Sequence, residues 1–361
     1  MSFVLQRNEI MLLLGAGASE EAGIPITVQM IEKIETLLEN EWKKYAPLYE
    51  YIKTQYQQLQ NDSSAYLNVE DLVNTLDELL SLLRKEHALS LFHLSWIIFM
   101  EKVGGYSSEA VESFRNEIVI KLKEWIALEN PTRAKYYRKI ALFQKEYNFP
   151  LRIFTLNYDK CIEETCKQFA EDTKEIKCLI ERGFGDEDNE EMCWSWEKFS
   201  NREDDEKEPD IYLYKMHGSI DWTRDEKQKL IHKTITHINK HEIIFGTRQK
   251  VKHYDPFLFF IYEFREYALK SKIIIVCGYG FWDDHINDIL KQGLEADSEK
   301  ILLVNVYSGT EKEKKKFVKE RLKLESDKQI KIAVGKASEF FSNNLEMVKL
   351  DKYFDKKDLP F

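Results

Sequence analysis

Short apolar runs bounded by turn residues constrain the fold of this chain more than any other feature. Each run has the length of a β-strand, and apolar residues follow one another in it rather than alternating with polar ones. Such strands are buried on both faces, which is typical of a parallel sheet covered by helices. We therefore expect an α/β fold with a Rossmann-like parallel sheet. The seven predicted strands are Ile10–Leu14, Leu151–Thr155, Ile211–Met216, Glu242–Phe245, Lys272–Cys277, Lys300–Val306 and Ile330–Val334.

A long helical stretch separates the first two predicted strands. Between residues 27 and 150, apolar residues recur at three- and four-residue steps, which predicts amphipathic helices. One stripe consists of Met30, Ile31, Ile34, Leu37 and Leu38, and another of Leu72, Val73, Leu76, Leu79, Leu80 and Leu83. A helical insertion after the first strand either buttresses the sheet, or closes a site or builds an oligomer interface, and the sequence favours neither.

The other segments complete the predicted organisation. Residues 1–26 and 151–335 form the sheet domain, residues 27–150 the helical insertion subdomain, and residues 336–361 a C-terminal tail. The tail carries aromatic residues among charges and is expected to dock onto the body or onto a neighbour. Residues 185–209 are dense in Asp and Glu, which predicts an exposed loop.

Composition and charge exclude several classes of protein. The net charge of −10 makes direct nucleic-acid binding unfavourable, because phosphate contacts need clustered Lys and Arg. The apolar runs are much shorter than the ~20 residues of a membrane-spanning helix, and the N-terminus lacks the apolar stretch of a signal peptide. The five cysteines include no C-x-x-C pair, so neither a disulfide framework nor a zinc ribbon is indicated. We expect a cytoplasmic protein without a membrane segment.

The first motif is a glycine turn directly after the first predicted strand. It reads Gly15-Ala16-Gly17-Ala18-Ser19, and Gly-Ile-Pro follows shortly after. Glycines let backbone N–H groups approach a pyrophosphate closely, and the next helix adds positive partial charge. Ser19 supplies a further hydroxyl donor. The fingerprint G-x-G-x-x-G fails in this turn, and the acidic residue expected about 20 residues later is missing, which disfavours a conventional hydride-transfer enzyme.

Polar residues follow two further predicted strands. Asn157 and Asp159 come after Leu151–Thr155, and His217 comes after Ile211–Met216 with a glycine behind it. Ligands bind at the carboxyl ends of strands in open α/β sheets. Asn157 and Asp159 taken alone more often cap the next helix, whereas His217 offers a base near neutral pH with room for a ligand. We expect Asn157 at an exposed strand end, where the imidazole can meet it across the sheet edge.

A second glycine turn follows the predicted strand Lys272–Cys277. It reads Gly278-Tyr279-Gly280-Phe281 and leads into a helix for which Asp283 is a suitable N-cap. The two glycines permit close approach of the backbone. We expect this turn to face the same crevice as the first.

In this order the motifs GAGAS…GIP, TLNYD, MHGS and CGYGF-x-DDHIN resemble the sirtuin superfamily, and especially its bacterial branch found in antiviral defence proteins. The similarity spans about residues 10 to 290. It implies a sirtuin-like fold in which the glycine turn, with Gly15, Ala16, Gly17 and Ser19, holds NAD.

The resemblance also assigns roles to the strand-end residues. It implies that Asn157 orients water and ribose and that His217 acts as the base. Asp159 is expected to support the nicotinamide side of the pocket. The loop with Gly278, Tyr279 and Phe281 is expected to lie near the adenosine half.

Two features depart from the deacetylase pattern of that family. Only Cys277 follows His217, so the four-cysteine zinc module is missing and no zinc is expected. Ile26 and Thr27 stand where a deacetylase has Phe-Arg. The resemblance therefore implies an NAD hydrolase that produces nicotinamide and ADP-ribose. A non-catalytic regulatory subunit that binds NAD or ADP-ribose, and a deacylase or ADP-ribosyltransferase, are the alternatives.

An unrestrained NAD hydrolase would deplete NAD in its own cell, so we expect gated activity. Members of the resembling branch are activated by oligomerisation, by a nucleotide-sensing domain, or by a partner such as a HerA-type DNA-translocating ATPase. Little length remains outside the sirtuin-like region for a sensor. The resemblance thus favours a homo-oligomer, or a partner in trans, acting in anti-phage defence by NAD depletion.

Overall fold

The main sheet has seven strands, and every neighbouring pair is parallel. The computed structural model describes residues 5–60, 67–84, 107–173, 178–184, 192–199, 208–224, 229–232 and 255–354. The strand order is β10-β9-β8-β1-β2-β5-β3. The strands are β1 (Ile10–Leu14), β2 (Leu151–Thr155), β3 (Ile180–Glu181), β5 (Ile211–Lys215), β8 (Ile273–Cys277), β9 (Ile301–Val306) and β10 (Ile330–Val334). The predicted α/β class with a parallel sheet is confirmed.

Six of the predicted apolar runs form strands of this sheet within one residue of the expected bounds. The run Glu242–Phe245 lies outside the described residues. The seventh strand is β3 instead, which pairs with β5 at the edge of the sheet. Its two residues are only half-buried and no apolar run marks them, so the sequence pattern did not predict this strand.

Helices cover both faces of the sheet. Successive side chains of a strand point to opposite faces, so a strand that is apolar throughout presents apolar side chains on both. Leu12 and Leu14 of β1 pack into one core, and Met11 and Leu13 pack into the other. The first core includes residues of α6 (Arg138–Tyr147), α7 (Cys161–Thr173), α12 (Ala337–Asn344) and α13 (Met347–Asp351). The second includes residues of α9 (Phe257–Lys270), α10 (Asp284–Ala296) and α11 (Glu311–Arg321). The complete burial of β1 follows from this three-layer arrangement.

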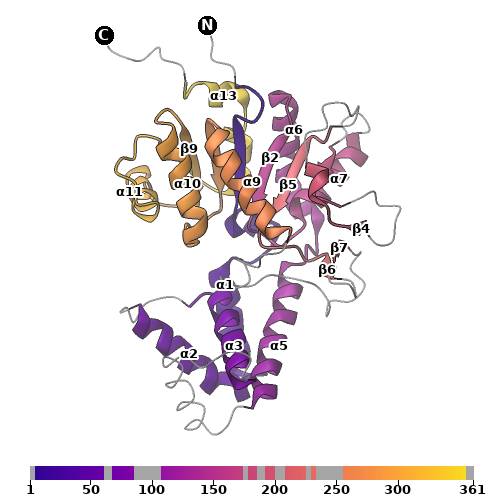
Figure 1. Cartoon of the computed structure of the whole chain (residues 1–361), viewed down its shortest axis with the longest axis vertical. Helices are drawn as coiled ribbons and strands as arrows, with labels where there is room; N and C mark the ends of the chain where they lie inside the picture. The colour runs from indigo at the N-terminus through magenta and orange to yellow at the C-terminus, as the bar shows by residue number, and fades with distance from the viewer. Residues whose placement is uncertain are drawn as a thin grey trace.

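The larger part of the predicted helical insertion forms a lobe beyond the carboxyl edge of the sheet (Figure 1). Its described helices are α1 (Thr27–Glu39), α2 (Ala46–Leu59), α3 (Val69–Leu83) and α5 (Ser108–Ile126). Met30, Ile31 and Ile34 of the first predicted stripe are buried, as are Leu72 and Leu76 of the second. Both stripes belong to the same apolar core as one face of the sheet.

The segment that returns from the lobe packs beside the sheet. The 3₁₀ helix η5 (Pro131–Tyr137) and α6 both contact α7. The C-terminal helix α12 contacts the same two elements, and its Phe341 ring stacks on Tyr136 with centroids 5.9 Å apart. The first part of the C-terminal tail therefore docks onto the body of the chain itself.

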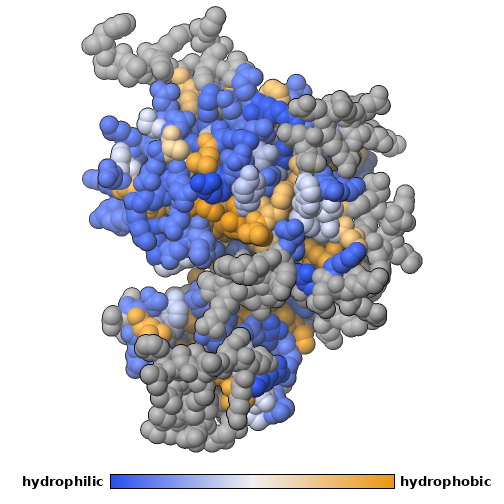
Figure 2. Space-filling view, viewed as in Figure 1, coloured by the Kyte–Doolittle hydropathy of each residue, from blue (hydrophilic) through white to orange (hydrophobic). Residues whose placement is uncertain are grey.

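The surface visible in Figure 2 is mostly hydrophilic over the sheet domain, with hydrophobic residues gathered over α9. Leu258 on this helix is 57% exposed, and Ile261 is half-buried. The opposite side of α9 is buried against the sheet through Phe260 and Phe264. Among the described helices, none combines the length and the apolar character needed to cross a bilayer.

A small antiparallel sheet, which the sequence pattern did not predict, lies beside β5. Its order is β4-β7-β6, with β4 (Met192–Cys193), β6 (Trp222–Arg224) and β7 (Leu230–His232). β4 and the 3₁₀ helix η6 (Trp196–Phe199) lie inside the acidic region expected to be one exposed loop, so that prediction is wrong for residues 192–199. The reason is Phe199, which is buried and packs against Tyr214 with ring centroids 4.8 Å apart.

Buried charges hold this small sheet against the main one. The Asp221 carboxylate is fully buried and accepts hydrogen bonds from Arg182 at 3.1 Å and from His232 at 2.9 Å. Glu163 of α7 pairs with the same arginine and with Lys215 of β5. Burial raises the pKa of Asp221, but Arg182, His232 and nearby lysines outweigh it and hold this pKa well below its ordinary value.

We predict that Asp221→Asn destabilises the fold at neutral pH. It leaves Arg182 without its full charge partner, and breaking a buried pair costs about 3–5 kcal/mol. A depressed folded-state pKa contributes stability above the unfolded value of ~3.9, and this stability is lost as the pH falls through the folded-state pKa. Urea unfolding should be measured near neutral pH and at acidic pH. Near neutral pH the variant should have the lower unfolding free energy, and on acidification its unfolding free energy should fall by less than that of the wild type.

Asp172→Asn is the matched control, because its carboxylate forms an exposed pair with Arg138. Exposed pairs contribute about 0–1 kcal/mol. Equal unfolding free energies for the two variants would contradict the structural role of Asp221.

Candidate functional site

Four of the predicted motifs meet at the carboxyl edge of the sheet. The last residue of β1, Leu14, is paired with Thr155 of β2 on one side and Cys277 of β8 on the other. Thr155 is in turn paired with Lys215 of β5. The segments that follow these four strands therefore start side by side. Strand order reverses at β1, and open α/β sheets bind ligands at this kind of position.

The two glycine turns lock onto each other through their backbones. The Gly15 N–H donates to the Cys277 carbonyl at 2.9 Å, and the Gly17 N–H donates to the Gly278 carbonyl at 3.0 Å. A Cβ atom on Gly278 would lie 2.0 Å from the Ala18 nitrogen, and this residue has a φ of +69°. These N–H groups are thus engaged within the protein while the turns remain in contact, and any phosphate must be held by other donors.

We predict that Gly278→Ala destabilises the protein by at least the roughly 1–3 kcal/mol typical of overpacking. Its backbone neighbours cannot move aside as a flexible side chain can, and its positive φ adds strain. Gly280→Ala is the control, because the added Cβ would meet only the side chain of the largely exposed Trp282. Thermal unfolding of both variants tests this, and a Gly278→Ala variant as stable as the control would disprove the contact.

Asn157 is buried, which corrects the expectation that it lies at an exposed strand end. It is 8% exposed, and its side-chain amide donates to the Gly15 carbonyl at 3.0 Å and to the Ser19 hydroxyl at 3.1 Å. Ser19 is fully buried and is also bonded to the Tyr137 hydroxyl of η5, 2.9 Å away. Both residues hold the glycine turn, so the Ser19 hydroxyl is not open to a phosphate in this arrangement.

We predict that Asn157→Ala lowers stability as well as any activity. The change removes two hydrogen bonds from a buried turn, and each contributes about 0.5–1.5 kcal/mol. Chemical denaturation should therefore show a lower unfolding free energy than in the wild type. An unchanged free energy would mean that these contacts are weaker than their geometry indicates.

Asp159 and the second glycine turn also take structural roles. Asp159 accepts the Cys161 N–H at 2.9 Å at the start of α7, as the helix-capping interpretation predicts. The Tyr279 hydroxyl donates to the Asn287 side chain at 2.9 Å, and the Phe281 carbonyl accepts from the same amide at 3.0 Å. Asp283 caps α10 as predicted. Phe281 is 1% exposed, so its ring belongs to the core rather than to an open pocket.

His217 lies at the end of β5 between two carboxylates. Its side chain is 7% exposed, with Glu70 Oε1 3.8 Å from Nδ1 and Asp283 Oδ2 3.7 Å from Nε2. The Tyr158 ring lies 6.2 Å away, and its hydroxyl donates to Glu70 at 3.3 Å. Burial, then Glu70 and Asp283, raise the pKa of Tyr158 well above its ordinary value, so this hydroxyl keeps its proton.

Sequence reasoning missed Glu70, which belongs to the helical lobe rather than to the sheet domain. It lies in the first turn of α3, where acidic residues are common because they favour the positive end of the helix dipole. That ordinary explanation gives no signal of its place beside His217. Only the folded chain brings Glu70 next to a residue more than a hundred positions later.

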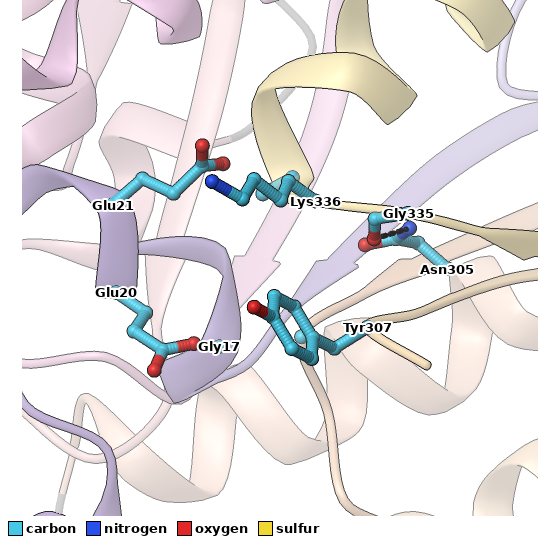
Figure 3. Close-up of a pocket in the computed structure, with 9 residues that line it drawn as sticks. Gly17, Glu20, Glu21, Asn305, Tyr307, Gly335 and Lys336 are labelled. Atoms are coloured by element: carbon cyan, nitrogen blue, oxygen red, sulfur yellow. Dashed lines mark hydrogen bonds between the residues drawn. The ribbon is translucent and has the colours of Figure 1, made fainter. Parts of the chain in front are cut away.

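A cleft opens on the other side of the glycine turns, over the ends of β8, β9 and β10 (Figure 3). It encloses about 340 Å³, open solvent at its mouth included. Its lining residues are Gly17, Glu20, Glu21, Gly278, Asn305, Tyr307, Gly335, Lys336 and Ala337. Of these, the sequence motifs identified only the two residues from the glycine turns, Gly17 and Gly278.

The polar side chains of the cleft come from the 3₁₀ helix η2 (Glu20–Ala22), from the end of β9 and from the N-terminus of α12. Figure 3 shows Tyr307 across the cleft from Glu20, and Lys336 extended toward Glu21. Glu21 accepts hydrogen bonds at 2.8 Å from the Ser338 backbone N–H and from its hydroxyl. The cleft therefore offers an aromatic ring and carboxylates rather than a cluster of cations. No group of His, Cys, Asp and Glu suited to a metal ion occurs among the residues described.

The SIR2-like domain family matches residues 151–331, which is just over half of the 361-residue chain. The chain belongs to this family, and the predicted sirtuin-like relationship is confirmed.

Solved Sir2 structures are similar to the chain at a distance. One, on the mechanism and regulation of Sir2 enzymes, has 14% identity and a TM-score of 0.41, and covers 96% of this chain and 94% of that one. A mutant Sir2 homologue with 2′-O-acetyl-ADP-ribose has 11% identity and a TM-score of 0.42, covering 97% and 94%. A Sir2 homologue complex with NAD has 11% identity and a TM-score of 0.40, covering 95% and 89%. A search of curated proteins finds no match.

Proposed function

We propose that this protein is an NAD glycohydrolase that cleaves NAD to nicotinamide and ADP-ribose. The observation that carries the proposal is the arrangement at the carboxyl edge of the sheet. In a member of the SIR2-like family, the glycine turn, Asn157 and His217 follow the adjacent strands β1, β2 and β5, and strand order reverses beside them. Such a position suits a dinucleotide.

The proposed substrate spans the two sides of the glycine turns. We place the adenosine half in the cleft beside Gly278, where the ring of Tyr307 is 68% exposed and available for stacking. The nicotinamide ribose then lies toward His217 and Asp159. The turn formed by Gly15, Ala16 and Gly17 separates these two positions and would adjoin the pyrophosphate.

The chemistry requires stabilisation of a ribose cation more than an acid. Nicotinamide leaves as a neutral group, and the transition state resembles the oxocarbenium ion of glycoside hydrolysis. The Asp283 carboxylate beside His217 supplies negative charge near this position. His217 accepts a proton from the attacking water or from a ribose hydroxyl.

The hydrogen bonds of Asn157 define what it can contribute. An amide nitrogen has two donors, and both are directed at protein acceptors, the Gly15 carbonyl and the Ser19 hydroxyl. Its carbonyl oxygen is therefore the group that would accept a hydrogen bond from water or from ribose.

Regulation and context form part of the proposal. We propose a cytoplasmic protein whose activity is gated by homo-oligomerisation or by a partner in trans such as a HerA-type ATPase. Its role would be anti-phage defence through NAD depletion. The support is the resemblance of the four motifs to the bacterial sirtuin-like branch, together with the self-harm that ungated hydrolysis would cause.

We predict that the purified protein releases nicotinamide and ADP-ribose from NAD, and that His217→Ala lowers the rate by roughly 10²–10⁴-fold, as expected for loss of a general base. Chromatography of the products over a range of protein concentrations measures both the activity and its dependence on assembly. His285→Ala is the matched control, because this histidine is exposed in the first turn of α10.

The other outcomes separate the alternatives. ADP-ribose binding by calorimetry without turnover at any concentration would favour the regulatory subunit. Nicotinamide release that depends on an acylated or acceptor peptide would favour the deacylase or the ADP-ribosyltransferase. If the protein neither binds ADP-ribose nor releases nicotinamide, the proposed NAD site is contradicted.

A further inference from the structure

One ring nitrogen of His217 has no hydrogen-bond partner. Nδ1 is buried and unbonded, and the nearest carboxylate oxygen, Oε1 of Glu70, lies 3.8 Å away. A buried polar atom without a partner is costly, so such atoms in native structures often mark a functional contact. The separation exceeds a charge-assisted hydrogen bond by only about 1 Å.

Glu70 is held in place independently of His217. Its helix is capped by Asn68, whose side chain accepts the Asp71 N–H. The Tyr158 hydroxyl donates to the same Oε1 atom that faces the imidazole. This hydrogen bond helps to hold the carboxylate beside the imidazole.

The carboxylate on the other side of the ring is committed elsewhere. Asp283 lies 3.7 Å from Nε2 through Oδ2, while its Oδ1 accepts the His285 N–H at 3.1 Å and caps α10. Asp283 must keep this position to hold the helix end, so it is not free to follow the ring. The two carboxylates thus have different roles.

We infer that Glu70 is the positioning residue of His217, and that the helical lobe thereby completes the active site. Glu70 accepts the Nδ1 proton of the imidazole and leaves Nε2 as the nitrogen that takes a proton from water or ribose. This is the general arrangement in which a carboxylate orients a histidine base. The inference rests on the proposed hydrolase function for its kinetic consequence, but the contact itself does not depend on that function.

The approach of the two groups requires only a small movement. Hydrogen bonds of catalytic groups are often long without substrate and shorten when it binds. Glu70 lies on α3 and His217 follows β5, and the gap to be closed between Oε1 and Nδ1 is only about 1 Å.

The test compares Glu70→Gln with Glu78→Gln, two turns further along α3. Glutamine keeps the size of the side chain but lacks the charge that orients the imidazole. We expect Glu70→Gln to lower kcat for NAD cleavage about 10²-fold, the lower end of base catalysis, with unchanged affinity for ADP-ribose. Glu70→Asp should recover part of the rate, and Glu78→Gln should behave as the wild type.

A spectroscopic readout separates this inference from the proposed function. In isotope-labelled protein, the ring-nitrogen NMR signals of His217, assigned by their loss in His217→Gln, report which nitrogen carries the proton. At a pH where the ring carries one proton, we expect that proton on Nδ1 in the wild type and a mixture of tautomers in Glu70→Gln. This result stands even if the wild type cleaves no NAD, in which case only the hydrolase proposal fails.

Two results would overturn the inference. One is a Glu70→Gln variant with the wild-type tautomer and the wild-type rate. The other is a variant whose lost rate is matched by lost ADP-ribose affinity and an unchanged tautomer, because that pattern belongs to general distortion of the site.

Discussion

The Gly17 N–H donates to the Gly278 carbonyl, and this contact between two turns sets the geometry of the whole carboxyl edge. No side chain lies between the two turns, so the backbones that follow β1 and β8 are in direct contact through backbone hydrogen bonds. Tyr136 and Tyr137 of η5 bond to Ala18 and Ser19 of the first turn, and Phe341 of α12 packs on both tyrosine rings. Residues from three distant parts of the chain thus hold one turn.

The charged side chains buried beside this edge hold neighbouring segments of the chain together. Lys215 ends β5 and bonds to the Asp159 carbonyl and to Glu163, so the segments that carry Asp159 and His217 are fastened to each other. Asp221 and Arg182 continue this network into the small antiparallel sheet. A network in which each charge has a partner can be buried, whereas an isolated charge cannot. The ends of β2 and β5 are therefore held together next to His217, the proposed base.

The helical lobe is joined to the sheet by a common core rather than by a linker. Its buried residues belong to the same apolar cluster as Leu12 and Leu14 of β1. Such continuity gives Glu70 of α3 a defined position over the end of β5. A lobe that shares its core with the sheet can contribute a side chain to a site with the accuracy that catalysis requires.

The sequence by itself determined the class of fold and the placement of the four motifs at one edge of the sheet. Runs such as Leu151–Thr155 are apolar throughout because both faces of a central strand are covered, and this burial is readable without coordinates. The apolar stripe of α3 can also be predicted from the sequence, because its spacing follows from the geometry of a helix with one buried face. The motifs after the strands were found because parallel strands end at one edge.

Only the tertiary structure decided what these residues touch. β3 and the strands of the small sheet are too short for a pattern; β3 exists because it pairs with β5, and β4 and β6 because both pair with β7. Asn157 turned out to be buried because the glycine turn folds over its amide. The approach of Glu70 to His217 brings together a residue of the helical lobe and a residue of the sheet domain. Local propensity describes neighbours in sequence, whereas contacts between distant residues follow from packing, which only the folded chain specifies.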